Sequence, residues 1–172
     1  FFFDNLDPDL NLNYKKIKSL KSSCFVVVSK SGRTIETIIN LGSIFSKNLL
    51  KNKLIIIAQL TDSTLMHIAN KYNAEIIEHK DFISGRYSVL SEPGMFPAAL
   101  MGLNIKEFSN LERFINNKKF VNSLISNVAS IYTLVLKRLK NSVVLNYNSN
   151  FNDLCLWYQQ LVGESLGKNG KS

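Results

Sequence analysis

A dense group of hydroxyl side chains lies near the start of the chain, between an apolar run and a helical pattern. Residues 29–37 read Ser-Lys-Ser-Gly-Arg-Thr-Ile-Glu-Thr and directly follow the valine run at 26–28. The free N–H groups of a first helical turn bind anions, and Gly32 allows the backbone to approach a ligand closely. The pattern is typical of a phosphate site with converging hydroxyls from Ser29, Ser31, Thr34 and Thr37.

The spacing of these residues leaves an ordinary alternative open. A strand that leads into a helix needs a cap, and Ser31 as the N-cap explains the same pattern with nothing bound. The segment is not a dinucleotide fingerprint, because the second and third glycines of that motif are absent.

The elements that position this segment follow from the alternation of apolar runs and helical patterns. Such a βαβαβ series predicts an α/β fold with a parallel sheet and right-handed crossovers. Unbroken apolar runs at 24–28 and 54–58 predict strands buried on both faces. The further strand-like runs are residues 1–3 and 74–77, and the helical patterns are residues 14–20, 34–46 and 63–72.

The second half of the chain differs, because helical patterns dominate from residue 96 to residue 140 after a turn-rich segment at 85–94. Residues 143–145 predict a strand, and the aromatic-rich residues 150–163 predict a helix. The longest predicted helix, 119–140, carries on one face Phe120, Leu124, Val128, Ile131, Val135 and Leu139.

Composition restricts the class of protein and of partner. The 172 residues are 45% apolar and 20% charged, which is ordinary globular usage and excludes a disordered or collagen-like chain. The net charge is +8, but only four of the 21 basic residues are arginine, and the lysines are scattered. Nucleic-acid binding proteins carry a clustered stripe or a known motif. We therefore expect no nucleic-acid partner, and a basic balance suits a small anionic substrate.

The cysteines indicate a protein of a reducing compartment, and the cysteines and histidines together give no indication of a metal site. Cys24 and Cys155 are far apart and lie in apolar runs, so we expect two buried thiols and a cytoplasmic protein. Two histidines and two scattered cysteines give no spacing suited to metal ligands. No apolar run reaches about 18 residues, so no membrane span is expected.

Three motifs in sequence order resemble those of glucose-6-phosphate isomerases. Residues 29–37 resemble the phosphate-binding loop, and residues 85–91, Gly-Arg-Tyr-Ser-Val-Leu-Ser, resemble the signature around an active-site arginine. Residues 157–160, Trp-Tyr-Gln-Gln, followed by Glu-Ser-Leu-Gly-Lys at 164–168, resemble the segment of the catalytic glutamate. The resemblance covers essentially the whole chain and implies a flavodoxin-like, doubly wound sugar-isomerase fold.

The resemblance also implies roles for individual residues. Glu164 would move the proton between two carbons through an enediolate, and Arg86 would stabilise the charge on the enediolate oxygens. Without the motif, Glu164 would be read as a solvated residue at a helix end, and Arg86 as a structural arginine. The residues implied in binding the substrate phosphate are Ser29, Lys30, Ser31, Thr34 and Thr37.

Four positions depart from the family pattern. Arg33 stands where a small residue is usual, so it either adds a charge beside the phosphate or points it to solvent. Ser84 replaces a glycine, which makes the backbone less free. Glu92 and Pro93 stand where small and apolar residues are usual, so the segment that carries Arg86 is expected to sit slightly differently.

The family pattern implies that the chain is an internal piece of a longer enzyme. A Gly-rich turn is expected upstream, and a ring-opening His, supplied by the partner subunit of a homodimer, and a Lys are expected downstream. Residues 1–100 would then be most of a first sugar-isomerase domain, 101–141 connecting helices, and 142–172 the start of a second domain.

The implied activity is the isomerisation of glucose 6-phosphate and fructose 6-phosphate in glycolysis and gluconeogenesis, without a cofactor. The piece by itself is expected to be inactive. Two alternatives stay open: a non-catalytic phosphosugar-binding module, and an isomerase that also accepts mannose 6-phosphate. The first needs neither the Arg86 nor the Glu164 segment, so the enzyme is favoured.

Overall fold

The computed structural model describes residues 1–4, 6, 22–46, 53–139 and 141–167. The predicted helix at 14–20 lies outside these residues. The described chain divides into two compact units, Phe1–Leu103 and Asn104–Ser172, and each is considered by itself below. This division does not test the predicted domain organisation, which stays a prediction.

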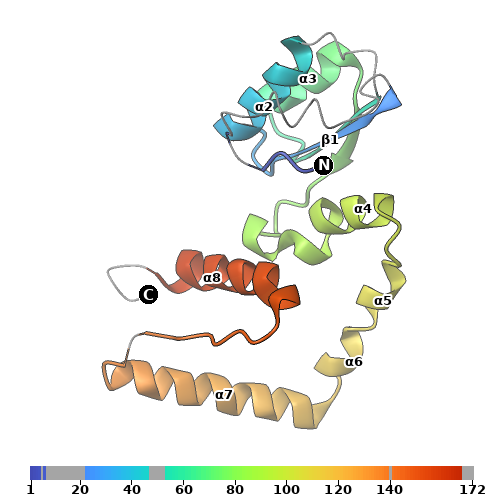
Figure 1. Ribbon diagram of the computed structural model, residues 1–172. Coiled ribbons are helices and arrows are strands. Elements are labelled where there is room, and N and C mark those ends of the chain that lie inside the picture. Colours follow the sequence, from blue (N-terminus) through green and yellow to red (C-terminus); the bar gives the residue numbers. More distant parts are fainter. Residues whose placement is uncertain (5, 7–21, 47–52, 140, 168–172) are drawn as a thin grey trace. The chain divides into compact units, whose positions relative to one another are not determined.

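The first unit is built on a parallel sheet of three strands, as predicted (Figure 1). The strands are β1 (Cys24–Val28), β2 (Lys53–Ala58) and β3 (Glu75–Glu78), and their order in the sheet is β1-β2-β3. Val28 pairs with Ile57, and Ile57 pairs in turn with Ile77. Because all three strands are parallel, the segments that follow them emerge at one edge of the sheet.

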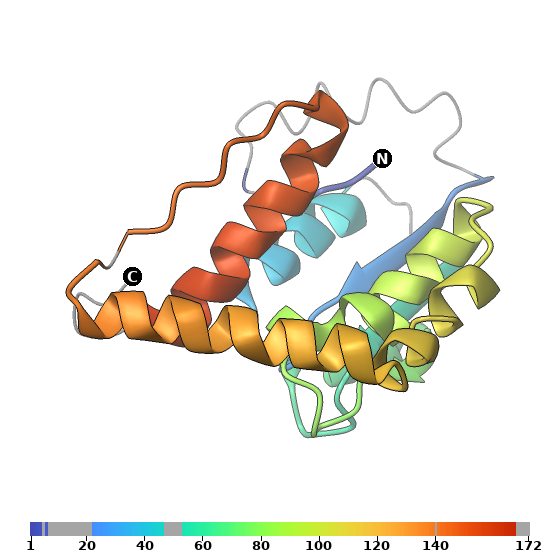
Figure 2. The same cartoon turned by 90° about the horizontal axis from the view of Figure 1, so that it is seen from below.

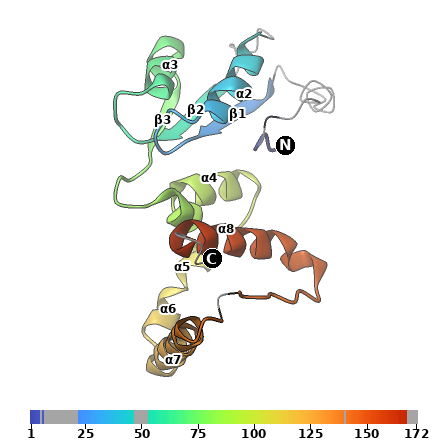
Figure 3. The same ribbon diagram turned by 90° about the vertical axis from the view of Figure 1, so that its left-hand side faces the viewer.

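Two helices connect these strands and cover the same face of the sheet (Figures 1 and 3). They are α2 (Ile35–Ser46) and α3 (Thr64–Tyr72). Two successive right-handed crossovers in one direction place both helices on one side. The α3 helix begins after Ser63, whose hydroxyl accepts the N–H of Met66, and it ends at Asn73 with φ 52°.

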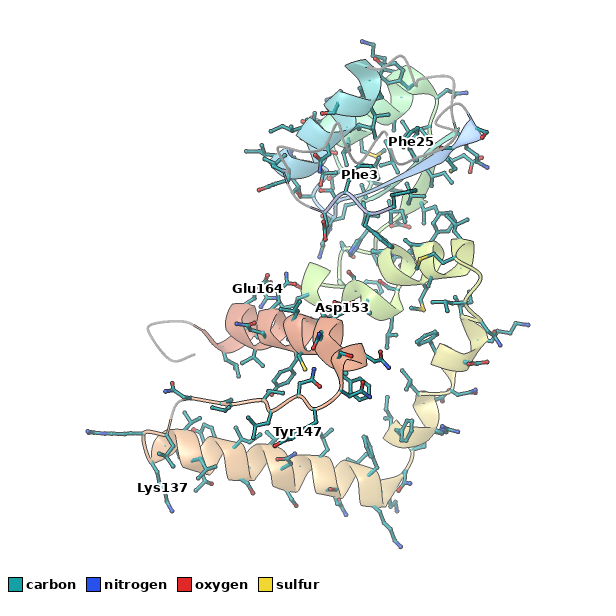
Figure 4. All side chains as sticks on the ribbon, in the orientation of Figure 1. Phe3, Phe25, Lys137, Tyr147, Asp153 and Glu164 are labelled. Atoms are coloured by element: carbon teal, nitrogen blue, oxygen red, sulfur yellow. The ribbon has the colours of Figure 1, made fainter. Side chains whose placement is uncertain are left out.

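The core of the first unit lies between this sheet and these helices. β2 is the central strand and is completely covered from Ile55 to Ala58. β1 is only partly buried, because it is an edge strand. Phe3 and Phe25 pack against the core (Figure 4). The remaining buried apolar residues are Val27, Leu41, Ile44, Leu65, Ala69 and Ala98.

A 3₁₀ helix and α4 follow β3 and complete the first unit. The 3₁₀ helix η3 covers Gly85–Leu90, and α4 covers Glu92–Leu100. The segment predicted to be turn-rich is therefore mostly helical. A Cβ atom at Gly94 would lie 2.0 Å from the carbonyl oxygen of Val89, so only glycine permits the close approach of the two helices.

The second unit is helical. Its elements are α5 (Lys106–Ser109), α6 (Glu112–Ile115), α7 (Lys118–Leu136), the 3₁₀ helix η4 (Ser149–Phe151) and α8 (Asn152–Leu166). Figure 2 shows the extended stretch, residues 141–148, that leads into η4 and α8. The described residues of α7 and α8 include no buried side chain.

The helix α7 ends four residues earlier than predicted. Arg138 takes φ 68°, and the N–H groups of Arg138 and Leu139 donate to the carbonyl oxygens of Val135 and Leu134. These two bonds form a Schellman end. By length and composition α7 also qualifies as a membrane-crossing helix, with 19 residues and mean hydropathy 1.2. Core helices of soluble proteins meet the same criterion, so one such helix is weak evidence for a membrane span.

Three other predictions were wrong. Residues 143–145 form no strand, because nothing in the described part of the chain pairs with them, and residues 1–3 form none either. Cys24 is exposed and Cys155 half-buried, so neither is a buried thiol. Cys24 is the first residue of an edge strand, where few neighbours cover it.

Candidate functional site

The predicted phosphate loop lies at the edge of the sheet where the three strands end. The Ser29 N–H donates to the carbonyl oxygen of Ile57 over 3.1 Å, and the His79 N–H donates to that of Ala58 over 2.8 Å. The carbonyl oxygen of Lys30 accepts from the Gln59 N–H over 2.9 Å. Main-chain bonds therefore hold the loop against the ends of the neighbouring strands.

The hydroxyls of Ser29 and Thr34 meet across the loop. Their oxygen atoms lie 2.8 Å apart, and Ser29 is only 6% exposed. The Gly32 N–H closes the turn on the carbonyl oxygen of Ser29 over 3.1 Å. The sequence prediction of converging hydroxyls therefore holds for this pair. Ser31 does not join it, because its hydroxyl accepts the Arg33 N–H over 3.2 Å.

Gly32 cannot be replaced by a residue with a side chain without strain. Its φ is +64°, and an added Cβ atom would lie 2.3 Å from the hydroxyl of Ser63. The carbonyl oxygen of Gly32 accepts the N–H of Leu65 over 3.1 Å. The loop thus packs directly against the start of α3, and this contact fixes its shape.

The start of α2 supplies the free N–H groups that an anion needs. The first helical bond runs from the Ile38 N–H to the carbonyl oxygen of Thr34, so Thr34 occupies the N-cap position and Ser31 does not. The N–H groups of the first turn therefore lack partners within the helix. Thr37 belongs to this turn, and Glu36 beside it is exposed, so solvent screens its charge.

Both basic side chains of the loop point to carbonyl oxygens of the chain. The Lys30 ammonium donates to the carbonyl oxygens of Asp81 over 2.9 Å and Ile83 over 2.6 Å. The Arg33 guanidinium donates to the carbonyl oxygen of Asp62 over 2.7 Å. The charge of Arg33, which departs from the family pattern, is therefore held at the α3 side of the loop by the carbonyl oxygen of Asp62.

Arg86 lies half-buried on η3, which follows the segment contacted by Lys30. The hydroxyl of Ser88 is buried and donates to the carbonyl oxygen of Gly85 over 2.6 Å, which stabilises the turn. Ser84 has φ −65° and ψ 146°, a conformation that any residue adopts. Replacing glycine by serine at 84 therefore introduces no strain. Glu92 and Pro93 lie in the first turn of α4, where both residue types are favourable.

Glu164 lies in the other unit, in the last turn of α8 (Figure 4). Its carboxylate accepts the side-chain N–H of Gln160 over 2.9 Å, and the residue is exposed. Within the first unit the hydroxyls of Ser29 and Thr34 meet, and Lys30 connects their loop to the segment that leads into Arg86. Glu164 belongs to the second unit.

A cavity of about 810 Å³ opens beside the loop, and no sequence pattern indicated it. Its lining includes Thr34 and Thr37 together with residues of β1, α2 and α4. The Asn40 side chain is buried at this cavity and donates to the carbonyl oxygen of Phe3 over 3.4 Å. The feature of the sequence that could have pointed to the cavity is a polar residue, Asn40, on the face of α2 that carries Leu41 and Ile44.

The sequence of the chain is similar to those of known proteins over nearly its whole length. The sequence model of the family described as phosphoglucose isomerase matches residues 1–172. The glucose-6-phosphate isomerase of Methanocaldococcus jannaschii is 32% identical, over 98% of this chain and 44% of its own length. That of Carboxydothermus hydrogenoformans is 30% identical, over 96% of this chain and 38% of its own length.

The fold has a close match among solved structures. The crystal structure of a hypothetical protein from Thermus thermophilus superposes on this chain with a TM-score of 0.79 and 23% sequence identity. The superposition covers 98% of this chain and 42% of the Thermus chain. This likeness confirms the predicted fold class. The chain spans less than half of the length of each of these relatives.

Proposed function

Because the chain belongs to the phosphoglucose isomerase family, we propose that the protein interconverts glucose 6-phosphate and fructose 6-phosphate through an enediolate. The observation that carries the proposal is the loop after β1. Its hydroxyl pair, Ser29 and Thr34, meets at the free N–H groups of a helix start, and the Arg86 segment follows a strand at the same edge.

The phosphate of the substrate binds to this loop. The helix dipole and the free N–H groups of the first turn of α2 favour a dianion there. The hydroxyls of Ser29, Thr34 and Thr37 add donors. The Ser31 hydroxyl accepts the Arg33 N–H and keeps its own O–H to donate to the anion. Lys30 belongs to the loop through its main chain, and its positive charge lies near the site.

Glu164 transfers the proton between the two carbons of the sugar. Isomerisation removes a proton from one carbon and returns it to its neighbour on the same face of the enediolate, so one carboxylate serves as base and then as acid. Arg86 stabilises the negative charge that develops on the enediolate oxygens, because a guanidinium stays protonated and presents several donors. Neither step requires a cofactor.

The setting of the activity follows from the same proposal. The whole enzyme works as a homodimer in the cytoplasm, in glycolysis and gluconeogenesis, with a His from the partner subunit for ring opening. The 172-residue chain alone has little or no isomerase activity, since it spans under half of its relatives. A non-catalytic phosphosugar-binding module and activity on mannose 6-phosphate are the alternatives that the experiment must separate.

Isotope exchange tests the proposal most directly. In the full-length protein, substrate labelled with deuterium at C2 should lose its label to water during turnover. Replacing Glu164 with Gln keeps the shape but removes the base, so kcat should fall roughly 10²–10⁴-fold. The exchange of the label should fall with it.

The matched control is Glu112→Gln, which removes an exposed carboxylate of the same unit on α6. Its turnover and exchange should match those of the unaltered protein. Unaltered protein without turnover but with phosphosugar binding would identify the binding module. A normal exchange rate in Glu164→Gln would assign the base to another residue. Mannose 6-phosphate is tested in parallel as a third substrate.

A further inference from the structure

The ammonium of Lys30 joins two segments that are distant in the sequence. It extends from the loop after β1 to the segment between β3 and η3, where it donates to the carbonyl oxygens of Asp81 and Ile83. Hydrogen bonds from a charged donor are about twice as strong as those between neutral groups. Two such bonds on carbonyls that lie two residues apart fix the course of the segment.

The segment that Lys30 holds leads directly into Arg86. The Ile83 N–H bonds back to the carbonyl oxygen of Lys80 over 3.3 Å, and the Tyr87 N–H bonds to that of Ser84 over 2.9 Å. Successive turns therefore connect the contact points of Lys30 to η3. A shift of the contact at Ile83 displaces Arg86, three residues further along the chain.

The same geometry limits what the ammonium does for a bound phosphate. A lysine ammonium has three N–H donors, and two of them already point to carbonyl oxygens. At most one donor remains for an anion, whereas the hydroxyls and the free N–H groups of α2 lie in the loop itself. The side chain of Lys30 therefore connects two parts of the site more than it completes the phosphate pocket.

We propose that Lys30 is a positioning residue that sets the place of Arg86 relative to the phosphate loop through the carbonyls of Asp81 and Ile83. The inference rests on the proposed function. A sugar phosphate spans the site, with the phosphate on the loop and the reacting carbons at Arg86. Misplacement of a catalytic group by about 1 Å lowers a rate roughly 10²-fold, so this link controls turnover.

Kinetics of the full-length protein with Lys30→Met test the link, since methionine keeps the length and loses charge and donors. The kcat for fructose 6-phosphate should fall about tenfold or more. The inhibition constant of inorganic phosphate, which reports on the loop alone, should change less than about threefold, because the hydroxyls and the free N–H groups of α2 bind the phosphate while the Lys30 ammonium donates to the carbonyl oxygens of Asp81 and Ile83. Lys30→Arg keeps donors and charge and should recover most of the turnover.

A double variant and a control variant test whether Lys30 acts through Arg86. In an Arg86→Lys background, Lys30→Met should add little further loss, because both changes act through one group. The control is Lys53→Met, which removes an exposed lysine at the start of β2 that pairs with Glu75 over 3.0 Å. Its turnover and inhibition constant should be unchanged.

Hydrogen exchange reads the link without activity. Lys30→Met should speed amide exchange at residues 83–88, and Lys53→Met should not. Independent losses of Lys30 and Arg86, a large change in phosphate inhibition with normal kcat, or unchanged exchange at 83–88 would each overturn the inference. Inactive unaltered protein would refute the proposed function instead, and the exchange result would still decide on the link.

Discussion

The two units of the chain differ in how their side chains are covered. In Phe1–Leu103 the strand β2 and its neighbours are buried, and Ile56 and Ile57 are 0% exposed. In the described part of Asn104–Ser172 no apolar side chain is buried, and α7 exposes its whole apolar face. The first unit therefore holds its own shape, whereas the helices of the second expose the surface that a core helix normally covers.

This difference divides the candidate site. The phosphate loop and the segment of Arg86 lie on the unit with a core, and main-chain bonds to buried strands fix them. Glu164 lies on a helix whose described residues include no buried side chain, and its carboxylate bonds to a residue one turn away on the same helix. The proposed anion site is thus held by bonds within the first unit, whereas the proposed base belongs to a helix of the second unit that exposes most of its side chains.

The largest effect expected from this comparison is on stability. In the 172-residue chain, Ile56→Ala should lower the free energy of unfolding by about 2–5 kcal/mol, because it leaves a cavity in the core. The same change at Ile125 on α7, which is 60% exposed, should stay within about 0.5 kcal/mol. Denaturant titration of both variants measures the difference.

Equal losses at the two isoleucines would break the comparison, because they would place Ile125 in a core of its own. Repeating the pair in the full-length protein sharpens it. A loss at Ile125 that appears only there would show that other parts of the protein cover this face of α7.

The division between anchoring and chemistry gives the second prediction. Ser31→Ala combined with Thr34→Ala in the full-length protein should weaken fructose 6-phosphate binding by at least roughly 100-fold, because each hydroxyl bond to a charged group contributes about 1.5–3 kcal/mol. The binding of fructose should hardly change. Glu164→Gln, by contrast, should leave phosphate affinity nearly unaltered. Titration calorimetry with both sugars measures these affinities.

The control for the double variant is Ser43→Ala, which removes a hydroxyl on α2 that donates to the carbonyl oxygen of Ile39 over 3.2 Å. It should bind both sugars normally. Equal losses for the two sugars in the double variant would contradict a phosphate role for this loop.

The smallest expected effect is at the surface of the first unit. The hydrogen bond from Lys80 to Glu78 and the negative charge of Glu78 raise the pKa of Lys80 above 10.5. A raised pKa adds stability that is present below pH 10.5 and is lost as the pH rises through the pKa of the folded state. Glu78→Gln should lower the pKa of Lys80, which NMR titration of its side chain measures.

Glu75→Gln is the matched change, because Glu75 pairs with Lys53 at the other end of β3. It should leave the pKa of Lys80 where it is. An unchanged pKa of Lys80 in Glu78→Gln would show that the exposed pair does not persist in solution.

Local sequence patterns predicted most of the first unit. The valine run predicted β1 with its observed bounds, and the apolar spacing at 34–46 predicted α2 to within one residue. The prediction of a strand at 143–145 was wrong, because three β-branched or aliphatic residues do not form a strand without a neighbouring strand to pair with. The turn-rich reading of 85–94 failed because the close approach of Gly94 to the carbonyl oxygen of Val89 lets α4 follow η3 directly, without a loop between them.

The sequence by itself determined the strand–loop–helix motif and the meeting of the hydroxyls of Ser29 and Thr34. Each of these follows from bonds between near neighbours in the chain. Only the tertiary structure decided where Lys30 and Arg33 place their charges, because their acceptors at Asp62, Asp81 and Ile83 are distant in sequence. A long cationic side chain reaches many acceptors, and the packing of the three strand ends at one edge selects among them.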